Sequence, residues 1–140
     1  MSLSIRNRLT GTVTEITSGA AMGTVAIDVT GGQRMTAAVT MDAIKDLSIS
    51  VGSAVDILIK STEVSLATGA VSGISIRNQL PGTVSSLETG GAMVVAHIVL
   101  DGGGEITAAI TRAAATDLGL ASGSTVIALI KSTEVALSAA

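Results

Sequence analysis

The sequence contains the run Ile59-Lys60-Ser61-Thr62-Glu63-Val64 and repeats it unchanged from Ile130 to Val135. The run Ser4-Ile5-Arg6-Asn7 returns in the same way as Ser75-Ile76-Arg77-Asn78. The offset is 71 residues in both cases (Ile59 to Ile130, Ser4 to Ser75), and the copies align without a gap. A regular duplication indicates two copies of one structural unit. We therefore predict two domains, 1–68 and 74–140, joined by a linker at 69–73.

The composition limits what each unit can build alone. Each copy is close to the smallest size that supports its own core, and the chain has no Phe, Tyr or Trp. The hydrophobic fraction is 47%, whereas only 14% of the residues are charged, so apolar surface needs cover. We expect the units to pack against each other and against further copies of the chain.

The residue types that are missing exclude several functions. The chain has no cysteine for disulfides or thiolate metal sites, and its single histidine, His97, cannot build a multi-histidine site. A net charge of −3 without aromatic stacking residues argues against nucleic-acid binding. No apolar run is long enough to span a membrane, and the first residues do not resemble a signal peptide. We expect a cytoplasmic protein that is not an enzyme and has no direct metal-cation ligands and no nucleic-acid or membrane partner.

Each copy predicts the element order β-β-β-α-β-β. In the first copy, strands are expected at 3–16, 22–29, 34–39, 54–60 and 63–67, with a β-bulge at Gly11 and a hairpin turn at Gly31-Gly32. Thr40 stands where a helix cap is expected, ahead of a short helix with one buried face. This order describes a small Greek-key barrel of the OB type. The predicted fold class is all-β, with two tandem OB-type barrels that each carry one short helix.

The copies differ on one face of the second strand. The first copy has Thr24, Ala26 and Asp28 there, and the second has Val95, His97 and Val99. Alternate residues of a strand share a face, so we expect this face of the second copy to be covered, with another copy of the chain as the first candidate. His97 is then interpreted as a packed or interface residue rather than a catalytic one.

A repeated set of hydrogen-bond donors is suited to an oxyanion. Ser4 and Arg6 share one face of the first strand, and Lys60 is followed by the hydroxyls of Ser61 and Thr62. Thr40 begins the expected helix, whose free amides and dipole favour negative charge. The second copy repeats the set as Ser75, Arg77, Thr111, Lys131, Ser132 and Thr133. Hydroxyls, amides and cations of this kind hold tetrahedral dianions.

Simpler interpretations of these residues stay open. Arg6 and Lys60 are alternatively ordinary surface charges, and the Ser and Thr residues ordinary turn and strand residues. Glu63 and Glu134, which recur in the two copies, are expected to offset nearby positive charge. The glycine-rich loops at 19–22 and 90–93 would let backbone amides approach an anion or another copy of the chain, or are plain loops that lead into a strand.

The opening motif Ser-x-Arg-Asn-x-Leu-x-Gly-x-Val and the closing motif Ile-Lys-Ser-Thr-x-Val resemble the Mop domain of the molbindins. Two such units in tandem are similar to a di-Mop molbindin over essentially the whole chain. The resemblance implies OB-type barrels that assemble as a homotrimer and store or buffer molybdate or tungstate in the cytoplasm, with no cofactor.

The resemblance also implies the anion sites. Sites between barrels would fall on Ser4, Arg6, Thr40, Lys60, Ser61, Ser75, Arg77, Thr111, Lys131 and Ser132. Sites near a threefold axis would use Gly19, Ala20, Ala21, Met22, Gly90, Gly91, Ala92 and Met93.

Elementary chemistry agrees with such a ligand. Molybdate carries no proton at neutral pH and only accepts hydrogen bonds, whereas hydrogen phosphate also needs an acceptor. Sulfate has the same charge but is smaller, so pocket size must distinguish it. The alternative to a storage protein is an anion-sensing interaction module that acts through a partner protein, and an enzyme is the least favoured function.

Overall fold

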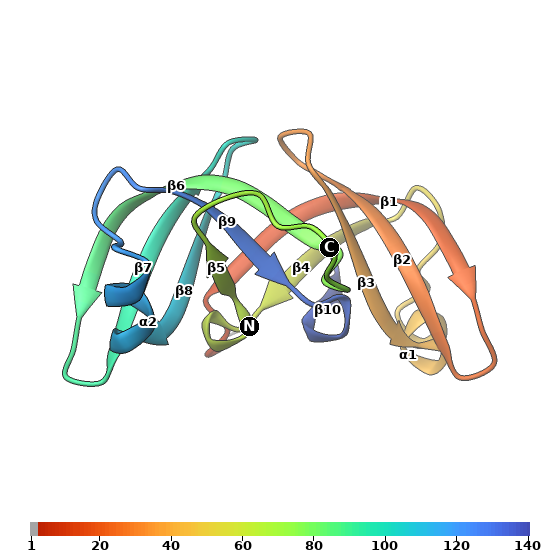
Figure 1. Ribbon diagram of the computed structural model, residues 1–140. Helices are drawn as coiled ribbons and strands as arrows, with labels where there is room; N and C mark the ends of the chain where they lie inside the picture. The colour runs from red at the N-terminus through yellow and green to blue at the C-terminus, as the bar shows by residue number, and fades with distance from the viewer. Residues whose placement is uncertain (1–2) are drawn as a thin grey trace.

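A computed structural model of the chain, which describes residues 3–140, has two lobes that meet along a shared centre (Figure 1). The first repeat contains β1 (Asn7–Ser18), β2 (Met22–Val29), β3 (Arg34–Thr40), α1 (Met41–Asp46), β4 (Ala54–Ile59), the short 3-10 helix η1 (Ser61–Glu63) and β5 (Ser65–Ala67). The second contains β6 (Asn78–Thr89), β7 (Met93–Leu100), β8 (Glu105–Thr111), α2 (Arg112–Asp117), β9 (Thr125–Ile130), η2 (Ser132–Glu134) and β10 (Ala136–Ala139). Within the described residues, none of the helices has the length and apolar character needed to cross a bilayer.

The two curled sheets confirm the predicted OB-type fold, but the repeats exchange their last strands. One sheet has the order β10-β4-β1-β2-β3 and the other β5-β9-β6-β7-β8. Strand β10 therefore pairs with β4 of the first repeat, for example Leu137 opposite Ile57, and β5 pairs with β9 of the second. Figure 1 shows β5 and β10 in the centre, between the lobes. Each lobe is therefore built from both repeats.

The first strand departs from the prediction at both ends and at the bulge. It spans Asn7–Ser18 rather than 3–16, and the predicted bulge at Gly11 is wrong, because the register shifts between Val13 and Glu15. Gly11 is needed for another reason. A Cβ there would lie 2.6 Å from Ile27 Cγ2 and 2.7 Å from the Asp28 carbonyl oxygen, so β2 approaches too closely for a side chain.

One hydrophobic core runs through both lobes, in agreement with the expectation that the units pack against each other. It is filled by aliphatic side chains from each repeat, such as Ile27, Ile57, Ile98 and Ile130, all at most 1% exposed. Branched aliphatic residues suit a pleated surface that is buried on one side. Small barrels without aromatic residues thus gain the larger core that neither repeat could form alone.

Two buried asparagines join the lobes by hydrogen bonds. Asn78 donates from Nδ2 to the Thr36 carbonyl oxygen at 2.9 Å and accepts at Oδ1 from the Thr36 amide at 2.8 Å. Asn7 makes the same pair of contacts with Thr107 of β8, at 2.8 and 2.7 Å. Each side chain therefore satisfies backbone groups at the edge of the sheet in the opposite lobe, as a neighbouring strand would.

The hairpins that join β2 to β3 and β7 to β8 also meet between the lobes, at the top of Figure 1. A Cβ on Gly31 would lie only 1.7 Å from the Gly102 carbonyl oxygen, whereas a Cβ on the next glycine, Gly32, would meet nothing within 4 Å. Both glycines have positive φ, at 106° and 100°. The turn requires both, but only Gly31 is required by the contact between lobes.

Candidate functional site

The predicted cations lie in pairs at one end of each sheet. Arg6 directly precedes β1 and Lys60 directly follows β4, and these strands are antiparallel with Asn7 opposite Ile59. The same register, Asn78 opposite Ile130, brings Arg77 beside Lys131 in the second sheet. Each strand end therefore carries two positive charges that lie far apart in the sequence.

These four cations have no carboxylate partner in the described residues. The arginine–carboxylate ion pairs there are Arg8 with Asp56 at 3.5 Å and Arg34 with Asp28 at 3.3 Å. Half of the eight cationic side chains thus stand at two strand ends of an acidic protein without local neutralisation. Unpaired, clustered cations of this kind attract anions.

Both arginines fold back onto the segment that leads into the first strand of the repeat. Arg6 Nε donates to the Ser4 carbonyl oxygen at 3.3 Å, and Arg77 Nη2 donates to that of Ile74 at 3.1 Å. A guanidinium has five N–H donors in a fixed plane, so most of each fork remains available. Ser4 and Ser75, each two residues before its arginine, are exposed.

Ser61 and Ser132 begin the 3-10 helices, and each lies against the other repeat. Helix η1 packs on β8 and η2 packs on β3. Ser61 Oγ is 2.6 Å from Thr107 Oγ1, whereas Ser132 Oγ is buried and has no hydrogen-bond partner in the described part of the chain. Each of these two predicted serines therefore lies against a strand of the other repeat.

Thr40 and Thr111 act as helix caps. Thr40 Oγ1 accepts from the Ala43 amide at 3.1 Å, and the Met41 amide donates to the Ala21 carbonyl oxygen at 2.8 Å. The expectation that the first amides of this helix are free is therefore wrong, because two of them are already bonded within the repeat. The second repeat has the same bonds at Ala114 and Arg112.

Thr40 and Lys60 line neighbouring hollows that share two residues of the second repeat. Thr40 lines an apolar groove together with Val135 and Ala136, which follow η2, and β3 packs on η2 rather than on η1. The segment that follows η2 therefore adjoins both Thr40 and Lys60.

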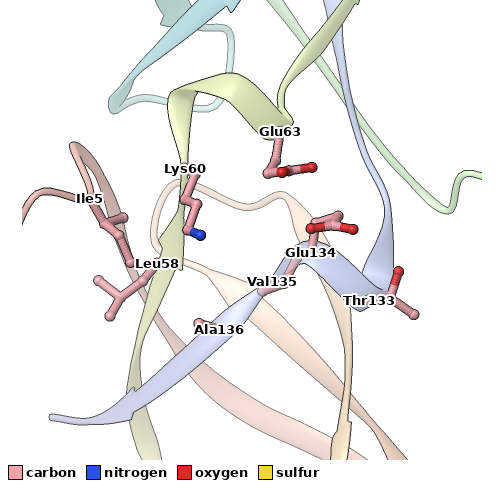
Figure 2. A pocket seen from close by; sticks show the side chains of 8 residues that line it. All are labelled: Ile5, Leu58, Lys60, Glu63, Thr133, Glu134, Val135 and Ala136. Atoms are coloured by element: carbon pink, nitrogen blue, oxygen red, sulfur yellow. The ribbon is translucent and has the colours of Figure 1, made fainter.

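Two carboxylates face each other beside Lys60. Glu63 and Glu134, one from each 3-10 helix, line a hollow of about 130 Å³ that Lys60 also lines (Figure 2). Neither forms an ion pair in the described residues, so the expectation that they offset a nearby cation is not met by direct contact. Arg6 and Arg8 line a neighbouring hollow of about 240 Å³ that shares Ile5 and Leu58 with this one, and the residues that line it include no carboxylate.

The glycine-rich loops form the tips of the β1–β2 and β6–β7 hairpins and are exposed. Met22 and Met93 at their ends are 47% and 43% exposed. No cation lies within either loop, so an anion there would depend on backbone amides. The sites predicted for 19–22 and 90–93 stay a prediction.

His97 lies in the middle of β7, as expected, with Nε2 3.4 Å from Glu88 Oε2. Val99 on the same face is 43% exposed. Within the described residues no group of three His, Cys, Asp or Glu side chains could hold a metal ion. The predicted cover over this face stays a prediction.

Sequence reasoning missed the residues that join the two lobes by hydrogen bonds next to the paired cations. These are Asn7 with Thr107 and Asn78 with Thr36. The asparagines recur in the opening motif and are followed by apolar alternation. A polar residue at the first position of a buried strand must find hydrogen-bond partners, and that signal could have identified them.

Comparison with known proteins agrees with the duplication. The TOBE domain family matches residues 3–66 and 74–137. The molybdenum-pterin-binding protein MopA of Rhodobacter capsulatus is 39% identical over 140 residues, which cover 98% of this chain and 52% of MopA. The molybdenum transport protein ModE of Herbaspirillum seropedicae is 36% identical over 132 residues, 94% of this chain and 49% of ModE. The chain thus spans about half the length of these curated relatives.

A solved structure matches the whole fold. The cytoplasmic molybdate-binding protein ModG, crystallised with molybdate bound, superimposes with a TM-score of 0.96 at 35% sequence identity. The match covers 100% of both chains. The arrangement of two lobes is therefore shared over the full length.

Proposed function

Because the chain belongs to the TOBE-domain family in its tandem, di-Mop molbindin form, we propose that it binds molybdate or tungstate at its paired strand ends. The observation that carries the proposal is the position of Arg6 beside Lys60 and of Arg77 beside Lys131, none of which forms an ion pair with a carboxylate of residues 3–140. The relatives named for molybdenum binding support the choice of anion.

The donor set suits an anion without a proton. Guanidinium and ammonium groups only donate hydrogen bonds, and charge-assisted bonds to them are roughly twice as strong as neutral ones. Molybdate and tungstate accept at all four oxygens and donate at none, so the anion brings no donor that would oppose those of the site. The hollow lined by Arg6 and Arg8 is open on one side, and Ser4 and Ser61 supply hydroxyls near the same strand end.

We propose that further copies of the chain close these open sites in a homotrimer. Large apolar side chains that remain exposed on one chain, Met22, Met93 and Val99, support such an assembly because their burial would stabilise it. The function would be cytoplasmic storage or buffering without a catalytic step. The description of ModG as cytoplasmic supports the location.

Equilibrium dialysis tests the proposal. The wild-type chain should retain molybdate in the presence of excess sulfate, and Lys60→Ala with Lys131→Ala should weaken binding more than tenfold while the protein stays folded. Each lost charge-assisted bond is worth about 1.5–3 kcal/mol. Lys45→Ala is the matched control, because Lys45 lies exposed in α1 outside the proposed sites. Equal affinity in all three proteins would show that the strand-end lysines are ordinary surface charges.

Native mass spectrometry with added molybdate tests the assembly and the number of bound ions together. A trimer that gains ions in whole steps is expected, and a monomer at working concentration would contradict the closing of sites between copies.

The length of the relatives supports a second candidate function, an anion-sensing module that acts through a partner protein. MopA and ModE extend well beyond the matched region. A partner that co-purifies in stoichiometric amount, and whose retention depends on molybdate, would favour this function over storage.

A further inference from the structure

The two copies of the Lys-Ser-Thr-Glu segment differ in what their serine hydroxyl does. Ser61 Oγ lies 2.6 Å from Thr107 Oγ1. Ser132 Oγ occupies the corresponding position in the second repeat, is buried, and has no hydrogen-bond partner within residues 3–140. One hydroxyl is thus engaged and the other is not.

Asn7 fixes the direction of the Ser61 hydrogen bond. The Thr107 amide can only donate and its carbonyl can only accept, so the Asn7 side chain must turn Oδ1 to the amide (2.7 Å) and Nδ2 to the carbonyl (2.8 Å). Thr107 Oγ1 also donates to Oδ1, at 3.1 Å. Because a threonine hydroxyl has a single proton, Ser61 must be the donor to Thr107, and its only proton is used.

The hydrogen bonds that link Ser61, Thr107 and Asn7 through their side chains have no counterpart at Ser132 in the part of the chain that the structure describes. Asn78 makes the same two contacts with the backbone of Thr36. Among the described residues, however, the Thr36 hydroxyl bonds neither to Asn78 nor to Ser132. The Ser132 proton is therefore uncommitted, and a rotation of that side chain toward a ligand breaks no existing bond. An unpaired buried hydroxyl also gains more from a new acceptor than a paired one does.

Carboxylates do not distinguish the two lysines. Glu63 and Glu134 line the hollow beside Lys60 (Figure 2), but Glu63 also lies near Lys131, because Ser65 stands opposite Leu129 just as Ala136 stands opposite Leu58. The additional arginine at the first end, Arg8, is offset by its ion pair with Asp56, and Gln79 stands at its place in the second repeat, bonded to the Ile76 carbonyl oxygen at 3.2 Å. The extra cation therefore does not compensate for the engaged serine.

We infer that the two strand ends bind a tetraoxo dianion with unequal affinity, the Lys131–Ser132 end more tightly than the Lys60–Ser61 end, and that Thr107 sets the difference. The inference rests on the proposed function. A dianion accepts hydrogen bonds only, so Ser132 can donate to it after a rotation that breaks no bond, whereas Ser61 must first break its bond to Thr107. The expected ratio is roughly tenfold, the equivalent of about 1.4 kcal/mol.

Titration calorimetry of the full chain with sodium molybdate tests this. The wild type should show two classes of site. Thr107→Val keeps the shape and the backbone contacts to Asn7 but removes the hydroxyl, so the weak class should tighten several-fold toward the strong one. Thr36→Val is the matched control at the corresponding position, where the hydroxyl engages neither Asn78 nor Ser132, and it should leave both classes unchanged. Thermal unfolding of both variants checks that they fold.

A second pair of variants decides the question even if Thr107→Val does not fold. Ser132→Ala should weaken the strong class about tenfold, and Ser61→Ala should change the weak class by much less. A single class in the wild type, or equal effects of the two alanine variants, would overturn the inference and leave molybdate binding intact. No binding by the wild type would overturn the proposed function and this inference with it.

Discussion

Replacing Asn78 with leucine removes one of the two amide bridges between the lobes. Asn78 is 1% exposed and holds the amide and carbonyl of Thr36 at 2.8 and 2.9 Å. Two hydrogen bonds contribute about 0.5–1.5 kcal/mol each, and an unpaired buried group costs about 1–3 kcal/mol. Because Thr36 is half-buried and leucine adds apolar contact, we expect the free energy of unfolding to fall by about 2–4 kcal/mol.

Urea unfolding followed by circular dichroism measures this change at one fixed protein concentration, since assembly contributes to stability. Gln79→Leu is the control, because Gln79 is the next residue of β6 and its side chain bonds only locally, to Ile76. It should cost less than about 1 kcal/mol. If Asn78→Leu costs no more than Gln79→Leu, the amide bridge does not hold the lobes together.

Three further predictions address the packing of the lobes. Gly31→Ala should destabilise the chain by at least about 2 kcal/mol more than Gly32→Ala, because both glycines have positive φ but only the first would clash with Gly102. Thermal unfolding of the two variants measures the difference, and equal losses of stability would mean that the hairpin contact is dispensable. Removal of residues 136–140 should speed amide exchange in β4, which loses its partner β10; unchanged exchange by mass spectrometry would contradict the observed pairing. Gly23→Val should be severely destabilising on its own, since a Cβ there would lie 2.8 Å from Met41 Sδ and 3.0 Å from Ile44 Cδ1. The added changes Met41→Arg and Ile44→Ala should restore stability, because the second repeat combines Val94 with Arg112 and Ala115 at the corresponding positions. Failure of the triple variant to recover its stability in urea unfolding would refute this compensation.

Local patterns in the sequence were sufficient for most of the fold. Alternation of apolar residues predicted β2 and β4 within one residue, and Thr40 was correctly placed as a helix cap. Gly31-Gly32 predicted the hairpin for the right reason, since both residues have positive φ. Gly11 was interpreted as a bulge, although its role is to let β2 approach.

The strand exchange could not be predicted from such patterns. The segments before β5 and β10 are identical in the two repeats, and each last strand is short. Either strand therefore suits either sheet by its local sequence, and only the path of the chain decides between them. The same limit applies to the site, because the serine of one repeat meets a threonine of the other and no spacing within a single repeat contains that pair.

The exchanged strands also set an order on folding during synthesis. The edge of β4 in the first sheet stays unpaired until β10 has been made, and β10 lies downstream of all the strands of the second sheet. A nascent chain thus carries an open edge through the translation of the whole second repeat, when such edges invite pairing with neighbouring chains. A chain that is truncated within the second repeat would lack the partner of β4, and this open edge could pair with a strand of another molecule.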